Sequence, residues 1–196
     1  MKLAPVTLAD PHVRLVPFDA ALHGADLRSM AEAAGDELKH WPYRGPGDWI
    51  ANWLASIAQR TGTGQMIPFA VLSPADGAFL GLTAYLSPDS QSRSVEIGMT
   101  VYAPSVHGTA INPAAKRLLL GHAFEQGAIR VQFNIDARNK RSQAAVRKLG
   151  AVQEGVLRDN RILPDNFLRS TVVFSILGRE WPEVKARLDA RLAALG

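Results

Sequence analysis

A run of small residues leads into the start of a helix near the middle of the chain. The stretch Val95–Glu125 reads as an alternating strand, a turn at His107–Asn112 and an apolar helix that begins close to Pro113. The first N–H groups of a helix have no partner within it, and the helix dipole adds partial positive charge there. Such a loop can hold an anion such as a pyrophosphate, although the same residues also suit an ordinary turn.

A carboxylate lies on the strand that precedes this loop. The strand has apolar residues at every second position, namely Val95, Ile97, Met99 and Val101. Glu96 alternates with them and is predicted on the opposite face of the strand. A carboxylate in this place can accept a proton during catalysis or hold a structural ion pair, and the residues alone leave both interpretations open.

Several chemistries are excluded by the residues that the chain lacks. It contains no cysteine, which excludes disulfides, thiolate metal sites and a cysteine nucleophile. Neither the G-x-x-x-x-G-K-[ST] phosphate loop nor the G-x-S-x-G nucleophile elbow occurs. The histidines are scattered without an i, i+4 pair, at positions 12, 23, 40, 107 and 122. We therefore expect no metal site.

The composition predicts one globular domain. The chain has 196 residues, of which 47% are hydrophobic and 20% are charged. This is enough for one sizeable core and too little for two. We expect a single domain over 1–196, with its core at about 12–178 and a C-terminal helix at about 180–194.

Charge and hydropathy limit the classes of partner. The net charge of +4 is spread along the chain, unlike the clustered Lys and Arg of nucleic-acid binders. No apolar run is long enough for a membrane span, and the N-terminus lacks the apolar core of a secretory signal. We expect a cytoplasmic protein with no nucleic-acid or membrane partner. The sequence pI near 9.7 suits a phosphorylated small molecule.

Hydrophobic periodicity predicts an α/β fold. Strands are expected at 12–18, 67–73, 78–86, 94–102, 130–136, 152–162 and 167–177. Helices are expected at 22–34, after an Asp48 N-cap, and at 114–126, 140–149 and 181–192. The order predicts a mixed, mostly antiparallel sheet of about seven strands flanked by helices, with one strand-helix-strand crossover.

Five segments together resemble the GNAT superfamily of N-acetyltransferases. They are Val95–Gly98, His107–Asn112, Ala137–Ser142, Lys148–Ala151 and Glu154–Arg158. The likeness covers almost the whole chain. Within the superfamily, the chain resembles the branch of the ribosomal-protein alanine acetyltransferases. It implies a GNAT fold that is splayed between the fourth and fifth strands. It also implies an acyltransferase that moves an acetyl group from acetyl-CoA to a primary amine by direct attack in a ternary complex.

The resemblance implies that the loop holds the pyrophosphate of coenzyme A through backbone amides. The loop residues are His107, Gly108, Thr109, Ala110, Ile111 and Asn112. The family pattern has Gln or Arg where His107 stands, and Gly where Ala110 stands. The extra methyl group of Ala110 predicts either an ordinary negative φ at this position or weaker cofactor binding.

Further roles follow from the same resemblance. Backbone amides near Thr100 and Val101 would pair with the pantetheine arm and polarise the thioester carbonyl. Asn139 would reach pantetheine, and Ser142 would lie near the sulfur and protonate the thiolate, although both also suit a helix N-terminus. Glu96 would serve as the general base. Val146 stands where some family members have a tyrosine acid, which leaves Ser142 or water in that role.

The acceptor site is expected to come from the first two helices. Trp41, Tyr43 and Arg44 are the candidate substrate-binding residues, with Trp41 as a lid in its Pro- and Gly-rich loop. Trp49 and Trp53, at i and i+4, are more typical of a core. The acceptor itself stays open between a protein N-terminus and a small-molecule amine. The terminal hairpin and helix are candidates for contact with a second copy in a homodimer.

Two other functions compete with acetyl transfer. The altered loop is compatible with a non-catalytic sensor or scaffold that binds acyl-CoA. A basic nucleic-acid-binding domain would need a contiguous positive stripe, which the sequence does not contain. The nearest basic cluster comprises Arg138, Lys140, Arg141, Arg147 and Lys148, which can neutralise the nucleotide end of the cofactor or form a solvated helix face.

Overall fold

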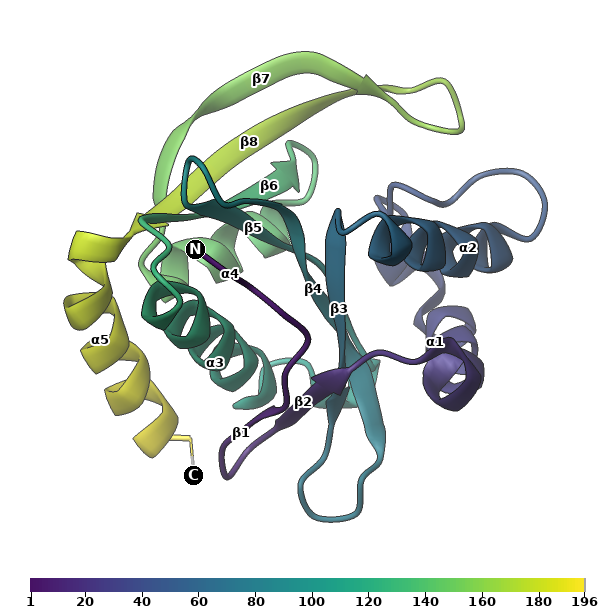
Figure 1. Cartoon of the computed structure of the whole chain (residues 1–196). Coiled ribbons are helices and arrows are strands. Elements are labelled where there is room, and N and C mark those ends of the chain that lie inside the picture. Colours follow the sequence, from purple (N-terminus) through teal and green to yellow (C-terminus); the bar gives the residue numbers. More distant parts are fainter. Residues whose placement is uncertain (196) are drawn as a thin grey trace.

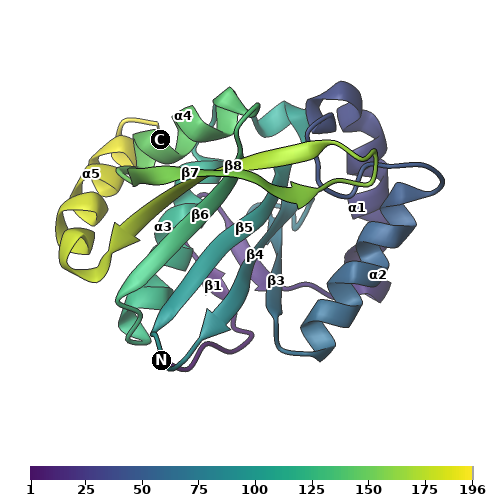
Figure 2. The ribbon, with the colours of Figure 1, turned by 90° about the horizontal axis from the view of Figure 1, so that it is seen from above.

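A twisted sheet crosses the molecule between two groups of helices (Figures 1 and 2). The computed structural model describes residues 1–195. Its strands are β1 (Leu8–Ala9), β2 (Arg14–Pro17), β3 (Met66–Leu72), β4 (Phe79–Asp89), β5 (Ser94–Tyr102), β6 (Arg130–Asp136), β7 (Val152–Ile162) and β8 (Leu168–Leu177). The seven predicted strands are all present. The eighth, β1, has only two residues, too few for any alternating pattern in the sequence.

Five α-helices and three short 3₁₀ turns complete the part of the fold that residues 1–195 form. The helices are α1 (Ala20–Ala34), α2 (Trp49–Gly62), α3 (Ile111–Glu125), α4 (Lys140–Leu149) and α5 (Trp181–Ala193). The 3₁₀ turns are η1 (Gly35–Leu38), η2 (Pro104–Val106) and η3 (Gly178–Glu180). Helix α3 starts three residues before the predicted start at 114, because Pro113 occupies the third position of its first turn.

The two groups of helices cover separate cores. One core joins the sheet to α3, α4 and α5, and includes Leu119, Phe174 and Leu188. The other joins the sheet to α1 and α2 around Trp53, which is fully buried. Figure 1 shows α3 and α5 on one side of the strands and α1 and α2 on the other. Trp53 is therefore a core residue, as its helical spacing predicts.

Local signals in the sequence set the helix boundaries. The carboxylate of Asp48 accepts a hydrogen bond from the Ala51 N–H at 2.9 Å, which confirms the predicted N-cap of α2. Helix α4 ends at Gly150, whose φ of 100° is left-handed and suits glycine. These ends matter for the site because α2 and α4 approach it from opposite faces of the sheet.

The sheet opens between its two central strands. The strand order is β1-β2-β3-β4-β5-β6-β8-β7, and only β5 and β6 run parallel. These two strands pair at just three positions, the last of which joins Glu96 to Gln132. Beyond it β5 stays paired with β4 and β6 stays paired with β8, so the two strands separate. The fourth and fifth predicted strands, 94–102 and 130–136, are β5 and β6, so the predicted splay between them is confirmed.

A bulge lies on the open part of β5. The register shifts so that Leu82 faces Val101 while Ala84 faces Gly98, which leaves one extra residue on β5. Met99, in this segment, has a φ of +50°, a conformation that side chains rarely adopt. The bulge turns the backbone of β5 at the place where the sheet opens.

None of the helices within residues 1–195 has the length and apolar character of a membrane span.

Candidate functional site

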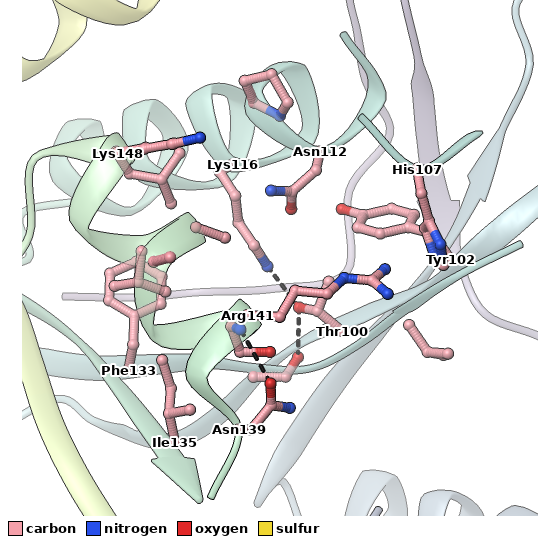
Figure 3. Close-up of a pocket in the computed structure, with 18 of the residues that line it drawn as sticks. Thr100, Tyr102, His107, Asn112, Lys116, Phe133, Ile135, Asn139, Arg141 and Lys148 are labelled. Atoms are coloured by element: carbon pink, nitrogen blue, oxygen red, sulfur yellow. Dashed lines mark hydrogen bonds between the residues drawn. The ribbon is translucent and has the colours of Figure 1, made fainter. Parts of the chain in front are cut away.

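Two cavities meet where β5 and β6 separate. The α3-side cavity has a volume of about 500 Å³ and lies between β5, β6, α3 and α4 (Figure 3). The hairpin-side cavity has a volume of about 660 Å³ and is lined by parts of α2, β7 and β8. Both cavities are lined by His40, Trp41, Gly98, Thr100, Asn134, Ile135, Asn139 and Ser142. The splay therefore connects the two faces of the sheet.

The loop before α3 borders the α3-side cavity. His107, Gly108, Thr109 and Asn112 line it, as the sequence predicts. The side chain of Ala110 packs into the core instead, and Ile111 packs against the same core. The φ of Ala110 is −66°, so alanine fits there without strain, whereas Gly108 has a φ of +81°. The position that needs glycine in this loop is 108 rather than 110.

A carboxylate from η1 lies at the mouth of this cavity. Glu37 Oε2 lies 3.0 Å from His107 Nδ1 and 3.0 Å from Arg141 Nη1. The contact joins the N-terminal helices to the loop and to α4. Sequence reasoning missed Glu37, because no local pattern shows that residues more than sixty positions apart meet. Lys148 of the basic cluster also lines the cavity, whereas Arg138 pairs with Asp136 at 2.7 Å.

A buried lysine forms part of the same wall. Lys116 Nζ donates to Thr83 Oγ1 at 3.1 Å and to Thr100 Oγ1 at 2.5 Å. Only 4% of the residue is exposed, and this burial lowers its pKa to about 7. Sequence reasoning missed it, although Lys116 shares the apolar helix face of Leu119 and Leu120 and could have been noticed by that spacing.

Glu96 lines the hairpin-side cavity next to the shared wall. Its Oε2 accepts a hydrogen bond from Asn134 Nδ2 at 2.7 Å. Burial raises the pKa of Glu96, and the Asn134 bond and the charges of nearby arginines partly oppose that rise. Glu96 has no ion pair within residues 1–195, so the structural ion pair considered from the sequence is absent. Asn134 was not predicted as a site residue.

Asn139 and Ser142 lie at the start of α4, where the two cavities meet. Asn139 Oδ1 accepts a hydrogen bond from the Ser142 N–H at 2.9 Å, so Asn139 is the N-cap of α4. Figure 3 shows this bond beside the labelled Thr100. Thr100 and Val101 line the α3-side cavity at the bulge of β5, and Val146 lines it from α4. Position 146 therefore supplies an apolar wall and no hydroxyl.

The three candidate acceptor residues separate in the structure. Trp41 lines both cavities, and Tyr43 lines the hairpin-side cavity. Arg44 lines neither of them, because its guanidinium donates to the Gly35 carbonyl at 2.8 Å, at the end of α1. The prediction of Arg44 as a substrate-binding residue therefore has no support in the geometry. Its type and position near Trp41 did not reveal that it caps a helix.

Three buried polar groups without partners belong to residues that line these cavities. Within residues 1–195, the Tyr102 hydroxyl, the Trp41 indole N–H and the Arg169 Nε are buried and make no hydrogen bond. Tyr102 lines the α3-side cavity, Arg169 lines the hairpin-side cavity, and Trp41 lines both. An unpaired buried donor costs free energy unless a ligand or water accepts from it. The three groups lie beneath the surface of the cavity walls.

Comparisons with known proteins agree with this geometry. The family profile described as acetyltransferase (GNAT) domain matches residues 12–152. A protein from T. thermophilus assigned as an acetyltransferase is 38% identical, with a TM-score of 0.84 over 98% of this chain and 100% of that chain. A search of curated protein sequences finds no match.

Two further solved structures have the same fold. Mycobacterium smegmatis RimJ in complex with CoA-disulfide is 25% identical, with a TM-score of 0.77 over 95% of this chain and 93% of that chain. A GCN5-related N-acetyltransferase from Brucella melitensis is 24% identical, with a TM-score of 0.88 over 98% and 87% of the respective chains. The chain belongs to the GNAT family of N-acetyltransferases and is similar to its RimJ-like branch.

Proposed function

We propose that the protein transfers an acetyl group from acetyl-CoA directly to a primary amine while both are bound. The observation that carries this proposal is the wall shared by the two cavities, which includes Gly98, Thr100 and Ser142. A donor in the α3-side cavity and an amine in the hairpin-side cavity can meet there through the opening in the sheet. Glu96 stands on the amine side of that opening.

The residues of the α3-side cavity fit coenzyme A. The peptide groups at the start of α3, together with Gly108 and Asn112, offer donors for a pyrophosphate. Arg141 and Lys148, which line the cavity, supply positive charge for the phosphates. The open edge of β5 at the bulge suits pairing with the amide groups of a pantetheine arm. When bound, acetyl-CoA supplies the acetyl group as an activated thioester.

The chemistry needs a neutral amine and a proton for the leaving thiolate. Glu96 accepts the proton of the acceptor ammonium, directly or through water, which frees the nitrogen lone pair. A C–N bond then forms as the C–S bond breaks, while N–H groups near Thr100 and Val101 stabilise the charge on the carbonyl oxygen. The Ser142 hydroxyl, or water beside it, returns a proton to the thiolate. The raised pKa of Glu96 brings the carboxylate closer to the strength needed in a base near neutral pH.

A thiol-release assay tests the proposal. The protein is mixed with acetyl-CoA and a panel of amines, and the acetylated product is identified by mass. We expect release that depends on the amine, with kcat lowered about 100-fold or more in Glu96→Gln. Glu183→Gln, at an exposed position on α5, is the matched control. Calorimetric binding of acetyl-CoA without turnover of any amine would favour the non-catalytic sensor, and absence of binding would contradict both functions.

A further inference from the structure

Three arginines from different elements surround the hairpin-side cavity. Arg60 lies on α2, Arg161 on β7 and Arg169 on β8, and all three line the cavity. Their charges act on Glu96, which lies in the same cavity and whose pKa each of them lowers. The sequence offers no sign of this cluster, because the three residues are far apart along the chain and meet only in the folded sheet.

The carboxylates of the cavity do not balance these cations. Arg60 and Arg161 take part in no ion pair within the described residues 1–195. The only hydrogen bond of the Arg60 side chain there goes to the Tyr43 hydroxyl at 3.5 Å. Asp136 is engaged mainly by Arg138, which donates to both of its carboxylate oxygens. Of the two carboxylates that line this cavity in the described structure, Glu96 is thus the one left to face Arg60 and Arg161.

Arg169 is the most deeply placed of the three. Only 6% of the residue is exposed; its Nε makes no hydrogen bond and has only a long ion pair with Asp136, at 3.8 Å, within the described residues. Its Nη2 reaches only the Asn134 carbonyl, at 3.5 Å. A guanidinium buried with so few acceptors is costly unless a ligand supplies them. A carboxylate or phosphate oxygen is the acceptor that suits it best.

The cavity is also partly closed over. The β7–β8 hairpin arches over the sheet, and its turn lies on the side of α1 and α2 (Figures 1 and 2). A Cβ added at Gly45 would lie 2.6 Å from Pro164 Cβ, so the hairpin turn packs against the loop that holds Trp41 and Tyr43. The cavity volume of about 660 Å³ matches a small molecule.

From this charge and enclosure we infer that the acceptor is a small primary amine that also carries a carboxylate or a phosphate, which Arg60, Arg161 and Arg169 bind while Glu96 receives the ammonium proton. The inference rests on the proposed acetyl transfer and adds the class of acceptor. The cations hold the anionic group, and the ammonium end is drawn to the carboxylate of Glu96. A neutral or purely cationic amine gains nothing from the arginines.

Matched pairs of acceptors test the inference. Each pair shares the amine and differs only in the anion: β-alanine against β-alaninamide, O-phosphoethanolamine against ethanolamine, and the dipeptide amide Ala-Asp-NH2 against Ala-Asn-NH2. We expect kcat/KM to be at least tenfold higher for an anionic member, mainly through KM. The first two pairs distinguish carboxylate from phosphate. A preference seen only with the dipeptide would overturn the small acceptor in favour of an acidic peptide N-terminus.

Substitutions of Arg60 and Arg161 test whether these residues cause the preference for anionic acceptors. In Arg161→Gln and Arg60→Gln the ratio of kcat/KM between anionic and neutral members should fall about tenfold. Arg158→Gln, also on β7 but outside both cavities, is the matched control and should keep the ratio. Equal rates within every pair, or a preference that survives both substitutions, would overturn the inference while leaving acetyl transfer intact.

If no amine turns over, binding of the acetylated products can still test the role of the arginines. Thermal shift with N-acetyl-β-alanine and N-acetyl-β-alaninamide then reports on the arginines alone. We expect the anionic product to stabilise the protein and Arg161→Gln to remove that stabilisation. The same shift with both products, or with neither, would overturn the inference. Failure of turnover with a retained anionic preference would count against the catalytic proposal only.

Discussion

The buried ammonium group of Lys116 makes stability depend on pH. Burial lowers its pKa in the folded protein to about 7 from an ordinary value of 10.5. The unfolded chain therefore binds one more proton than the folded protein between these two values. The cost of burying the charge is full below pH 7 and disappears as the pH rises to 10.5, which corresponds to about 5 kcal/mol.

Lys116→Met tests this dependence. Methionine keeps most of the side-chain volume and leaves Thr83 and Thr100, whose hydroxyls lie 2.9 Å apart, bonded to each other. We expect the variant to be more stable than the wild type, by a few kcal/mol at pH 6 and by almost nothing near pH 10. Urea unfolding of the ligand-free proteins over this pH range measures the difference. Lys140→Met, at an exposed position, is the control, and a gain in Lys116→Met that is independent of pH would contradict the expectation.

The hydrogen bond from Asn134 to Glu96 sets the pH range of the proposed base. The amide stabilises the charged carboxylate, so its removal in Asn134→Ala should raise the pKa of Glu96 further. Because the base must be ionised to accept a proton, we expect the acidic limb of the kcat/KM profile to move to higher pH by roughly one unit.

The control for this experiment comes from the same strand. Gln132 pairs with Glu96 in the sheet but lines neither cavity, so Gln132→Ala should leave the acidic limb in place. A loss of activity in Asn134→Ala without any movement of the limb would show that Asn134 only supports the structure.

At the scale of elements, η1 and α4 are joined across the mouth of the α3-side cavity. Glu37 engages His107 and Arg141, two side chains of the cavity in which the pyrophosphate is proposed to bind. The carboxylate therefore competes with the ligand. We expect Glu37→Gln to bind coenzyme A about two- to fivefold more tightly, as for the loss of a partly exposed ion pair. Calorimetry measures the affinity, Glu32→Gln on α1 is the control, and weaker binding in Glu37→Gln would contradict this role.

The contact between the β7–β8 hairpin and the loop before α2 closes the hairpin-side cavity. An added methyl group at Gly45 would collide with Pro164, so Gly45→Ala should displace the hairpin turn. We expect KM for the amine to rise several-fold while the affinity for acetyl-CoA stays the same. Gly155→Ala, on β7 with open space around it, is the control. Equal effects on both ligands would indicate general destabilisation instead.

At the scale of the whole molecule, two cavities that meet through one sheet predict a sequential kinetic mechanism. The proposed function has donor and acceptor bound together in these cavities, and the chain has no cysteine to hold the acetyl group. We expect intersecting lines in double-reciprocal plots, and reduced but measurable turnover in Ser142→Ala. Parallel lines, together with an acetylated protein detected by mass, would instead indicate a covalent intermediate.

Much of the architecture could be predicted from local patterns in the sequence. The alternation of Ser94–Tyr102 and Arg130–Asp136 predicted β5 and β6 with their observed bounds, and Gly150 predicted the end of α4. Hydrophobic period, caps and glycine positions depend on neighbouring residues, so a single sequence contains them. The family likeness then indicated the splay and the loop before α3, and the family profile confirms the membership.

The sequence by itself determined which elements form and which family they build, because both follow from residues close together along the chain. Only the tertiary structure decided which distant side chains meet. It brought Glu37 to His107, buried Lys116 against Thr100, set Asn134 beside Glu96, and turned Arg44 away from the site. Such contacts depend on how the strands twist and separate. The interaction energies and pKa values of the charged groups then depend on their burial and on the distances between them.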